Sequence, residues 1–266
     1  MTILLDAAGT LIRPAEPVGQ VYARHLASAA GLQVDSARMD SAFRAVFAAA
    51  LPPDYSLHPF GHAAEHAWWR DLVAGVLQSL GGEAATFAAE SSTRRPAPHR
   101  QSRLPGGNFR PPLDHLPATP ERPPTAAQGD EGTFDHFFHT LFTHFAQPSA
   151  WTLFPEVLSF LNSASRLGPL AVLSNFDDRL PAILDGLGIG PCFEHVFTSA
   201  DARARKPDRA LFDLALDRLN SAPAETAHCG DSLGADFHGA TAAGLRAFHL
   251  QRPAQSLLDF LEFCRS

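Results

Sequence analysis

The segment TILLDAAGTL, residues 2–11, is a short apolar run that ends at a carboxylate and a turn. An apolar run of this length is typical of a buried strand, and the Ala-Gly-Thr residues after it favour a turn. The segment therefore predicts a strand that carries Asp6 at its carboxyl end. A lone Asp in that place is often only a cap or turn residue, so its meaning depends on the rest of the chain.

Similar apolar runs recur later in the sequence, at residues 169–175, 195–200, 226–231 and 246–250. Helical patterns lie between or after them, at residues 179–188, 208–220 and 236–244. Strands that alternate with helices indicate a parallel sheet with helices on both faces. We therefore predict an α/β fold with a Rossmann-like core, in which the first strand pairs with strands beyond residue 155.

The apolar residues between these two parts recur at helical spacing instead. Four stretches read as amphipathic helices, at residues 18–31, 39–51, 63–81 and 133–146. We therefore predict an all-α cap domain, residues 15–151, inserted into a discontinuous core of residues 1–14 and 152–266.

Residues 84–132 break this helical pattern. Nine of the chain's 22 prolines lie there, and no hydrophobic period is sustained. Such a segment buries too little apolar surface to offset the entropy of ordering it. We predict a disordered insertion between two cap helices, either a solvated linker or an unspliced segment kept in the sequence.

The composition limits the partners of the protein. A formal net charge of −7 argues against nucleic acid, because binding phosphates requires clustered Lys and Arg. No run approaches the roughly 18–20 apolar residues that cross a bilayer, so we expect no membrane partner. No feature indicates an oligomeric state.

The termini and cysteines favour a cytoplasmic protein. A cleaved targeting peptide would remove Asp6, which lies five residues after Met1. The three cysteines, Cys192, Cys229 and Cys264, are widely spaced and odd in number, which fits neither a disulfide framework nor a zinc site.

Polar residues follow several of the predicted strands, where open α/β sheets place their sites. They are Asp6, Ser174 with Asn175, Lys206, and Asp231 with Asp236 five residues later. A carboxylate such as Asp6 can attack phosphorus and form an aspartyl-phosphate that water then removes. Asp6 and Asp231 could hold Mg²⁺, with Asp236 in support, because that ion prefers oxygen ligands.

The cluster of acids needs compensating donors. Ser174 and the turn that begins at Asn175 can donate to a phosphoryl oxygen, and Lys206 supplies a compact positive charge. Of the 21 basic residues, 20 are Arg and only Lys206 is Lys. The sole lysine at this position suggests that an ammonium group is required there.

These four segments, DAAGTL (6–11), VLSN (172–175), RKPD (205–208) and HCGDSLGAD (228–236), together resemble motifs I to IV of the haloacid dehalogenase superfamily. The helical insertion is similar to that family's C1-type cap. Within the superfamily the chain resembles the group of the haloacid dehalogenase-like hydrolase domain-containing protein 3 type. The resemblance implies a Mg²⁺-dependent phosphatase-like hydrolase acting on a small phosphorylated compound, with Asp6, Ser174 and Lys206 as catalytic residues and Ser174, Asn175 and Lys206 binding substrate.

The resemblance also assigns roles within the first motif. Gly9 forms the turn, Thr10 holds the loop, and the backbone carbonyl of Ala8 joins Asp6, Asp231 and Asp236 around the metal. The family's phosphatases have an Asp as general acid where this chain has Ala8. The resemblance therefore implies weak or specialised activity.

Two branches of the family manage without that Asp, and neither fits. Phosphonate hydrolases use a lysine of the cap, and the cap of this chain has none. Haloacid dehalogenases work without metal and have a less acidic motif in place of Gly-Asp, whereas this chain keeps Gly230-Asp231. Besides the phosphatase-like enzyme, two alternatives remain: a catalytically weak binder of a phosphorylated ligand, and a hydrolase of a non-phosphate bond whose acid comes from the cap.

Overall fold

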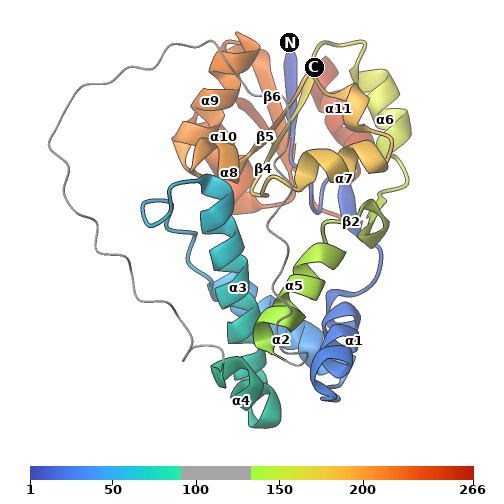
Figure 1. Cartoon of the computed structure of the whole chain (residues 1–266). Coiled ribbons are helices and arrows are strands. Elements are labelled where there is room, and N and C mark those ends of the chain that lie inside the picture. Colours follow the sequence, from blue (N-terminus) through green and yellow to red (C-terminus); the bar gives the residue numbers. More distant parts are fainter. Residues whose placement is uncertain (91–132) are drawn as a thin grey trace, which may run out of the picture.

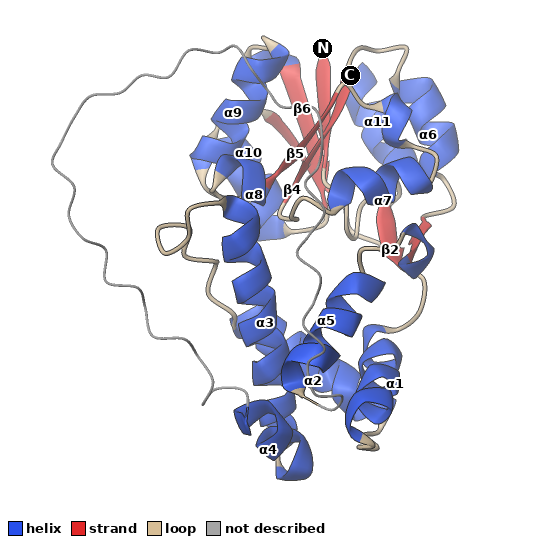
Figure 2. Cartoon of the chain, in the orientation of Figure 1, coloured by secondary structure: helices blue, strands red, loops and turns tan. Residues whose placement is uncertain are grey.

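The computed structural model describes residues 1–90 and 133–266. A parallel five-stranded sheet in the order β5-β4-β1-β6-β7 forms the centre of the core (Figure 2). Its strands are β1 (Thr2–Leu5), β4 (Leu170–Ser174), β5 (His195–Thr198), β6 (Thr226–Gly230) and β7 (Arg246–His249). The first strand lies in the middle, between β4 and β6. The predicted α/β class and the return of the first strand to the later ones are confirmed.

Helices cover both faces of this sheet. They are α6 (Val157–Ala164), α7 (Leu180–Gly186), α8 (Ser199–Ala202), α9 (Arg209–Leu219), α10 (Gly239–Ala242) and α11 (Leu257–Arg265). Alternate residues of β1 point to opposite faces, because the side-chain period of a strand is two. Ile3 and Leu5 pack in a cluster with residues of α6, α7 and α11, whereas Leu4 packs in a second cluster with residues of α9 and α10.

Two short antiparallel strands connect this core to the helical part. They are β2 (Ile12–Pro14) and β3 (Trp151–Leu153), which pair from Ile12 with Leu153 to Pro14 with Trp151. The described residues between them form α1 (Val18–Ala30), α2 (Ser36–Ala49), α3 (Gly61–Leu80), α4 (Gly82–Glu90) and α5 (Phe134–His144). These helices have an apolar cluster of their own. We call them the cap helices.

One predicted boundary is wrong. Residues 84–90 were expected to belong to a disordered insertion, but they form most of α4. Phe87 and Ala88 of this helix are buried in the apolar cluster of the cap helices, with Phe87 against Phe134 and Phe137. This burial stabilises a helix that its short sequence did not reveal. The rest of the predicted insertion, residues 91–132, lies outside the described residues.

The carboxyl ends of the strands face the cap helices. The N-terminus lies at the end of the core far from them, so β1 and its parallel neighbours all run toward the cap (Figure 1). The carboxyl ends of the strands therefore meet between core and cap. Nowhere in residues 1–90 or 133–266 is a helix both long and apolar enough to cross a membrane.

Candidate active site

Asp6 lies immediately after β1, and its side chain is almost completely buried. Its Oδ1 accepts hydrogen bonds from Ser174 Oγ at 2.9 Å and from Lys206 Nζ at 2.8 Å. The hydroxyl of Thr10 donates to Oδ2 over a longer 3.3 Å. Burial raises the pKa of Asp6, which Lys206 and Ser174 partly counteract. Oδ1 therefore fixes the orientation of the carboxylate, while Oδ2 accepts only the longer bond from Thr10.

Lys206 neutralises two acids at once. Besides Asp6, its ammonium group donates to Asp236 Oδ1 at 2.6 Å and to the carbonyl of Leu173 at 2.6 Å. Three bonds use all the donors of an ammonium group. Burial works against the charge, but Asp6 and Asp236 outweigh it and raise the pKa of Lys206. The only lysine of the sequence is therefore the cation at the centre of the acidic cluster.

Asn175 lies in the site, although its side chain does not point a free amide at a substrate. Its Nδ2 donates to the carbonyl of Lys206 at 2.9 Å, and the Lys206 amide donates to its Oδ1 at 2.8 Å. These paired bonds tie the loop after β4 to the loop that carries the lysine. The side chain of Asn175 therefore positions Lys206, and its role in binding substrate stays a prediction.

Two further carboxylates, those of Asp231 and Asp236, converge beside Asp6. Oxygens of Asp6, Asp231 and Asp236 lie within 4.8 Å of one another. Asp231 is exposed, and partial desolvation together with the charges of Asp6 and Asp236 raises its pKa to about 6. An all-oxygen donor set fits Mg²⁺, which one or two carboxylates usually hold together with water and substrate phosphate. Asp6 and Asp231 are the residues best placed to hold it.

Asp236 is held more firmly than the other two acids. His228 Nε2 lies 3.1 Å from its Oδ1, and the amide of Ser232 donates to its Oδ2 at 2.9 Å. Although burial raises the pKa of Asp236, Lys206 and His228 hold it well below its usual range. Since both of its oxygens already have partners, Asp236 fits a supporting role better than direct ligation.

The loop of residues 7–12 is a tight turn around the carbonyl of Ala7, which accepts from the amides of Thr10, Leu11 and Ile12. Gly9 has a φ of +94°, and a Cβ there would lie 2.3 Å from Asp231 Oδ2. Thr10 is fully buried. Within the part of the chain that the structure describes, no hydrogen bond uses the carbonyl of Ala8, so that oxygen is available to a metal.

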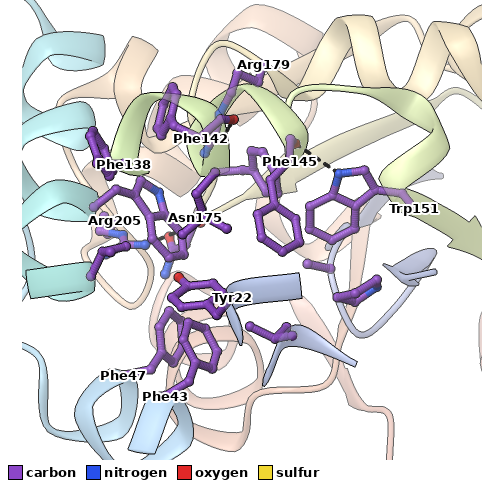
Figure 3. Close-up of a pocket in the computed structure, with 17 residues that line it drawn as sticks. Tyr22, Phe43, Phe47, Phe138, Phe142, Phe145, Trp151, Asn175, Arg179 and Arg205 are labelled. Atoms are coloured by element: carbon purple, nitrogen blue, oxygen red, sulfur yellow. Dashed lines mark hydrogen bonds between the residues drawn. The ribbon is translucent and has the colours of Figure 1, made fainter. Parts of the chain in front are cut away.

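The side chain of Ala8 lines a cavity of about 210 Å³ between core and cap. Aromatic rings from every neighbouring cap helix face it, including Tyr22 of α1, Phe43 of α2, Trp69 of α3 and Phe142 of α5. Figure 3 shows Tyr22, Phe43 and Phe142 gathered with Phe47, Phe138, Phe145 and Trp151 around a common space. We call this cavity the aromatic chamber.

Sequence reasoning did not identify the aromatic chamber. Residues 133–146 were expected only to form an amphipathic cap helix, and Phe137 of this helix is buried inside the cap. The available signal was the i, i+4 spacing of Phe43 with Phe47, of Trp69 with Val73 and of Phe138 with Phe142. That spacing predicts a shared helix face, but a core-facing stripe and a ligand-facing stripe have the same pattern.

Two arginines of the core lie at the edge of the aromatic chamber. Arg179 forms two hydrogen bonds of 2.7 Å to the carboxylate of Asp177 and stacks over Phe142 with 3.6 Å from its Cζ to the ring centre. Arg205 lies over Trp68 and 3.9 Å from the buried carboxylate of Glu65. Both arginines therefore link the core to cap helices.

Comparison with known proteins agrees with this architecture. Residues 1–244 match the model of the haloacid dehalogenase-like hydrolase family. Haloacid dehalogenase-like hydrolase domain-containing protein 3 of Bos taurus is 31% identical over 93% of this chain and 80% of its own length. A phosphoserine phosphatase of Thermus thermophilus is 30% identical over 94% of this chain and 88% of its own.

Solved structures share the fold at lower identity. The putative hydrolase YfnB of Bacillus subtilis, solved with bound magnesium, has a TM-score of 0.62 at 14% identity and covers 100% of this chain and 98% of that one. A phosphatase of Thermococcus onnurineus has a TM-score of 0.57 at 17% identity, covering 98% and 96%. The resemblance predicted from the four motifs is confirmed, and the chain belongs to the haloacid dehalogenase-like hydrolases.

Proposed function

We propose that the protein is a Mg²⁺-dependent phosphatase-like hydrolase that acts on a small phosphorylated compound through an aspartyl-phosphate at Asp6. The observation that carries the proposal is the buried carboxylate of Asp6, oriented by Ser174 and Lys206 within 4.8 Å of two further acids. A buried, oriented carboxylate at the end of a central strand is a positioned nucleophile. The same surroundings oppose the negative charge of a phosphate with an ammonium group.

Each residue then has a definite task. Asp6 attacks phosphorus, the bond from phosphorus to the leaving oxygen breaks, and a water molecule later frees the phosphate from the carboxylate. Ser174 and Lys206 keep the carboxylate in one orientation, and the positive charge of Lys206 opposes the negative charge of the phosphoryl group. Mg²⁺, held by Asp6, Asp231 and the carbonyl of Ala8, would neutralise charge on the phosphoryl oxygens.

Ala8 limits what this site can cleave. A positioned general acid is worth roughly 10²–10⁴-fold in rate, and a methyl group cannot supply it. Among the described residues that line the aromatic chamber, none is an Asp, Glu or His that could replace it from the cap. We therefore propose activity restricted to leaving groups that need little protonation.

The relatives support the reaction class. One curated relative is a phosphoserine phosphatase, and a protein with the same fold was solved with magnesium. We extend to this chain the use of a phosphorylated small molecule and of Mg²⁺. A cytoplasmic location stays our prediction from the three cysteines, which are free in the structure.

A second candidate function is a weak catalyst that binds a phosphorylated ligand for sensing. Ala8 favours it, because the rest of the anion and metal site is kept while the acid is missing. The third alternative, a hydrolase with an acid from the cap, gains no support from the residues around the aromatic chamber.

The proposed function is tested by phosphate release from acetyl phosphate and 4-nitrophenyl phosphate, two activated substrates, with Mg²⁺ and with EDTA. We expect turnover that requires Mg²⁺ and is abolished in Asp6→Asn. Equal turnover in Asp6→Asn, or none from the intact protein, would contradict the proposal. Mg²⁺-dependent binding of phosphate without turnover would favour the second candidate.

A further inference from the structure

We propose that the leaving group of the substrate is a flat, apolar aromatic ring system seated in the aromatic chamber, so that the substrate is an aryl phosphate monoester. This inference rests on the proposed function. It follows from what surrounds the chamber, from how its charged residues are used, and from its size.

The aromatic chamber opens next to the reacting atoms. Its lining includes Ala8, two residues after Asp6, and Asn175, the neighbour of Ser174. Asp6 and Ser174 are themselves joined by a hydrogen bond of 2.9 Å. A phosphoryl group at Asp6 therefore has its ester group directed toward the chamber, because the cap covers this end of the sheet (Figure 1).

The chemistry of the lining selects against polar leaving groups. Its described residues include nine aromatic side chains besides Val, Leu, Pro and Ala, with Asn175 and two arginines, and no Ser, Thr, Asp, Glu or Lys. A hydroxyl buried without a partner costs about 1–3 kcal/mol on scales from protein variants. A sugar or polyol phosphate would bury several hydroxyls here, whereas a ring gains stacking and apolar contact.

The two arginines do not make the chamber suitable for an amino-acid phosphate. The guanidinium of Arg179 uses Nε and Nη2 on Asp177 and donates Nη1 to the carbonyl of Phe142 at 3.1 Å. Asp177 is buried, so the charge of Arg179 is already neutralised. Arg205 donates Nη2 to the carbonyl of Asn175 at 3.3 Å, and its Nε, which forms no hydrogen bond in the described part of the chain, lies 3.9 Å from the buried carboxylate of Glu65. An incoming carboxylate would have to displace Asp177 from Arg179 or compete with Glu65 for Arg205. An ammonium group would find no acid among the described residues of the lining.

The volume fits one or two rings. A closed apolar cavity of about 150 Å³ in another protein binds benzene. The aromatic chamber, at about 210 Å³, has room for a substituted single ring or a small fused pair. Tyr22, Phe43 and Phe142 provide ring faces and edges against which such a group can stack (Figure 3).

An aryl leaving group also matches the missing acid. Asp6 attacks phosphorus, the bond from phosphorus to the aryl oxygen breaks, and the electron pair leaves with a phenolate that takes its proton from water. Tyr22 is a poor donor of that proton, because burial raises its pKa well above its usual range. A second water then attacks phosphorus, which restores the Asp6 carboxylate and releases phosphate.

The test compares two substrates with the same phenol ring, 4-methylphenyl phosphate and O-phosphotyrosine, which differ in the amino-acid group. Leaving-group acidity is nearly equal, so the ratio of kcat/KM reports the chamber. We expect 4-methylphenyl phosphate to be preferred about 10- to 100-fold, which corresponds to one or two unpaired polar groups. Acetyl phosphate, which has no ring, reports the proposed hydrolase activity separately.

Val18→Phe places a ring into the chamber from a half-buried position at the start of α1. We expect it to lower the ratio of kcat/KM for 4-methylphenyl phosphate over acetyl phosphate about tenfold. The control Leu158→Phe adds a ring at a position that is 61% exposed on α6, and the ratio should not change.

The outcomes separate the two proposals. Turnover of acetyl phosphate that requires Asp6, without preference for 4-methylphenyl phosphate over phosphotyrosine, overturns the aromatic leaving group and leaves the hydrolase intact. If no ester is turned over, the proposed function fails, and calorimetric binding of the same two esters to the intact protein decides the inference. Selective binding of 4-methylphenyl phosphate would support it, and equal or absent binding would overturn it.

Discussion

Gly9 and Asp231 are in such close contact that a Cβ on Gly9 would lie 2.3 Å from Asp231 Oδ2. The two residues come from loops after neighbouring strands, β1 and β6. The turn of the first motif therefore sets how closely the exposed carboxylate approaches Asp6. Glycine suits this position for two reasons: it adopts the positive φ without strain, and it has no Cβ to collide with Asp231.

Gly9→Ala should displace Asp231 and weaken metal binding. The substitution combines backbone strain of about 1–3 kcal/mol at a φ of +94° with a collision at a side chain that holds the metal. We expect at least a tenfold loss of Mg²⁺ affinity, because the displaced carboxylate is a principal ligand. Isothermal titration with Mg²⁺ measures it.

Gly31→Ala is the matched control for that prediction. Gly31 ends α1 with a φ of +70°, and a Cβ there would meet nothing within 4 Å. It should lose stability from strain alone and keep its Mg²⁺ affinity. Equal effects of both variants on Mg²⁺ binding would show that the contact between Gly9 and Asp231 is not important for the metal.

Lys206→Met should destabilise the fold strongly. It leaves the buried acids Asp6 and Asp236 without their shared cation, and removing one partner of a buried ion pair typically costs about 3–5 kcal/mol. Urea unfolding measures the loss. The double variant Asp6→Asn with Lys206→Met should recover part of it, because one of the stranded charges is gone.

The control is Arg209→Met, which breaks an exposed pair with Asp213 and should cost less than about 1 kcal/mol. No recovery in the double variant would mean that Asp6 and Lys206 do not interact energetically, contrary to their 2.8 Å contact.

The parts of the site that sequence reasoning found are those with a local pattern. Asp6 ends an apolar run, and Lys206 is conspicuous as the only lysine. The bonds between the Asn175 side chain and the backbone of Lys206 could not be predicted, because the two residues are 31 positions apart and meet only once the loops have folded. The aromatic chamber was missed because Phe137 and Phe142 belong to one helix, and only tertiary packing separates the buried ring of Phe137 from the half-buried ring of Phe142 that lines the chamber.

The stability of the cap helices should fall as the pH drops through about 6.5, the ordinary pKa of histidine. Burial is the largest cause that lowers the pKa values of His25, His66 and His144 in the folded protein. The unfolded chain then binds more protons than the folded one in this range, so the free energy of unfolding decreases with decreasing pH. Melting temperatures at pH 7.5 and 5.5 measure the change.

The triple variant His25→Gln, His66→Gln and His144→Gln isolates this contribution from that of the carboxylates. Its melting temperature should drop less between the two pH values than that of the unchanged protein. An equal drop in both proteins would show that the histidines contribute nothing to the pH dependence.

Ala8→Asp should restore the missing general acid. The side chain at this position is half-buried beside Asp6 at the mouth of the aromatic chamber, where a carboxyl group can reach the leaving oxygen. For an alkyl phosphate such as glycerol 3-phosphate, whose leaving group requires a proton, we expect kcat to rise by about 10²-fold or more. For 4-nitrophenyl phosphate the gain in kcat should be small, because that leaving group needs no acid. For 4-methylphenyl phosphate KM should rise, because the new carboxyl group makes the chamber less apolar.

The double variant Asp6→Asn with Ala8→Asp controls for a new reaction route and should be inactive. A gain of equal size on the alkyl and the nitrophenyl ester would show that Ala8 limits something other than proton transfer, and no gain on either would show that the leaving group does not pass this side of the loop.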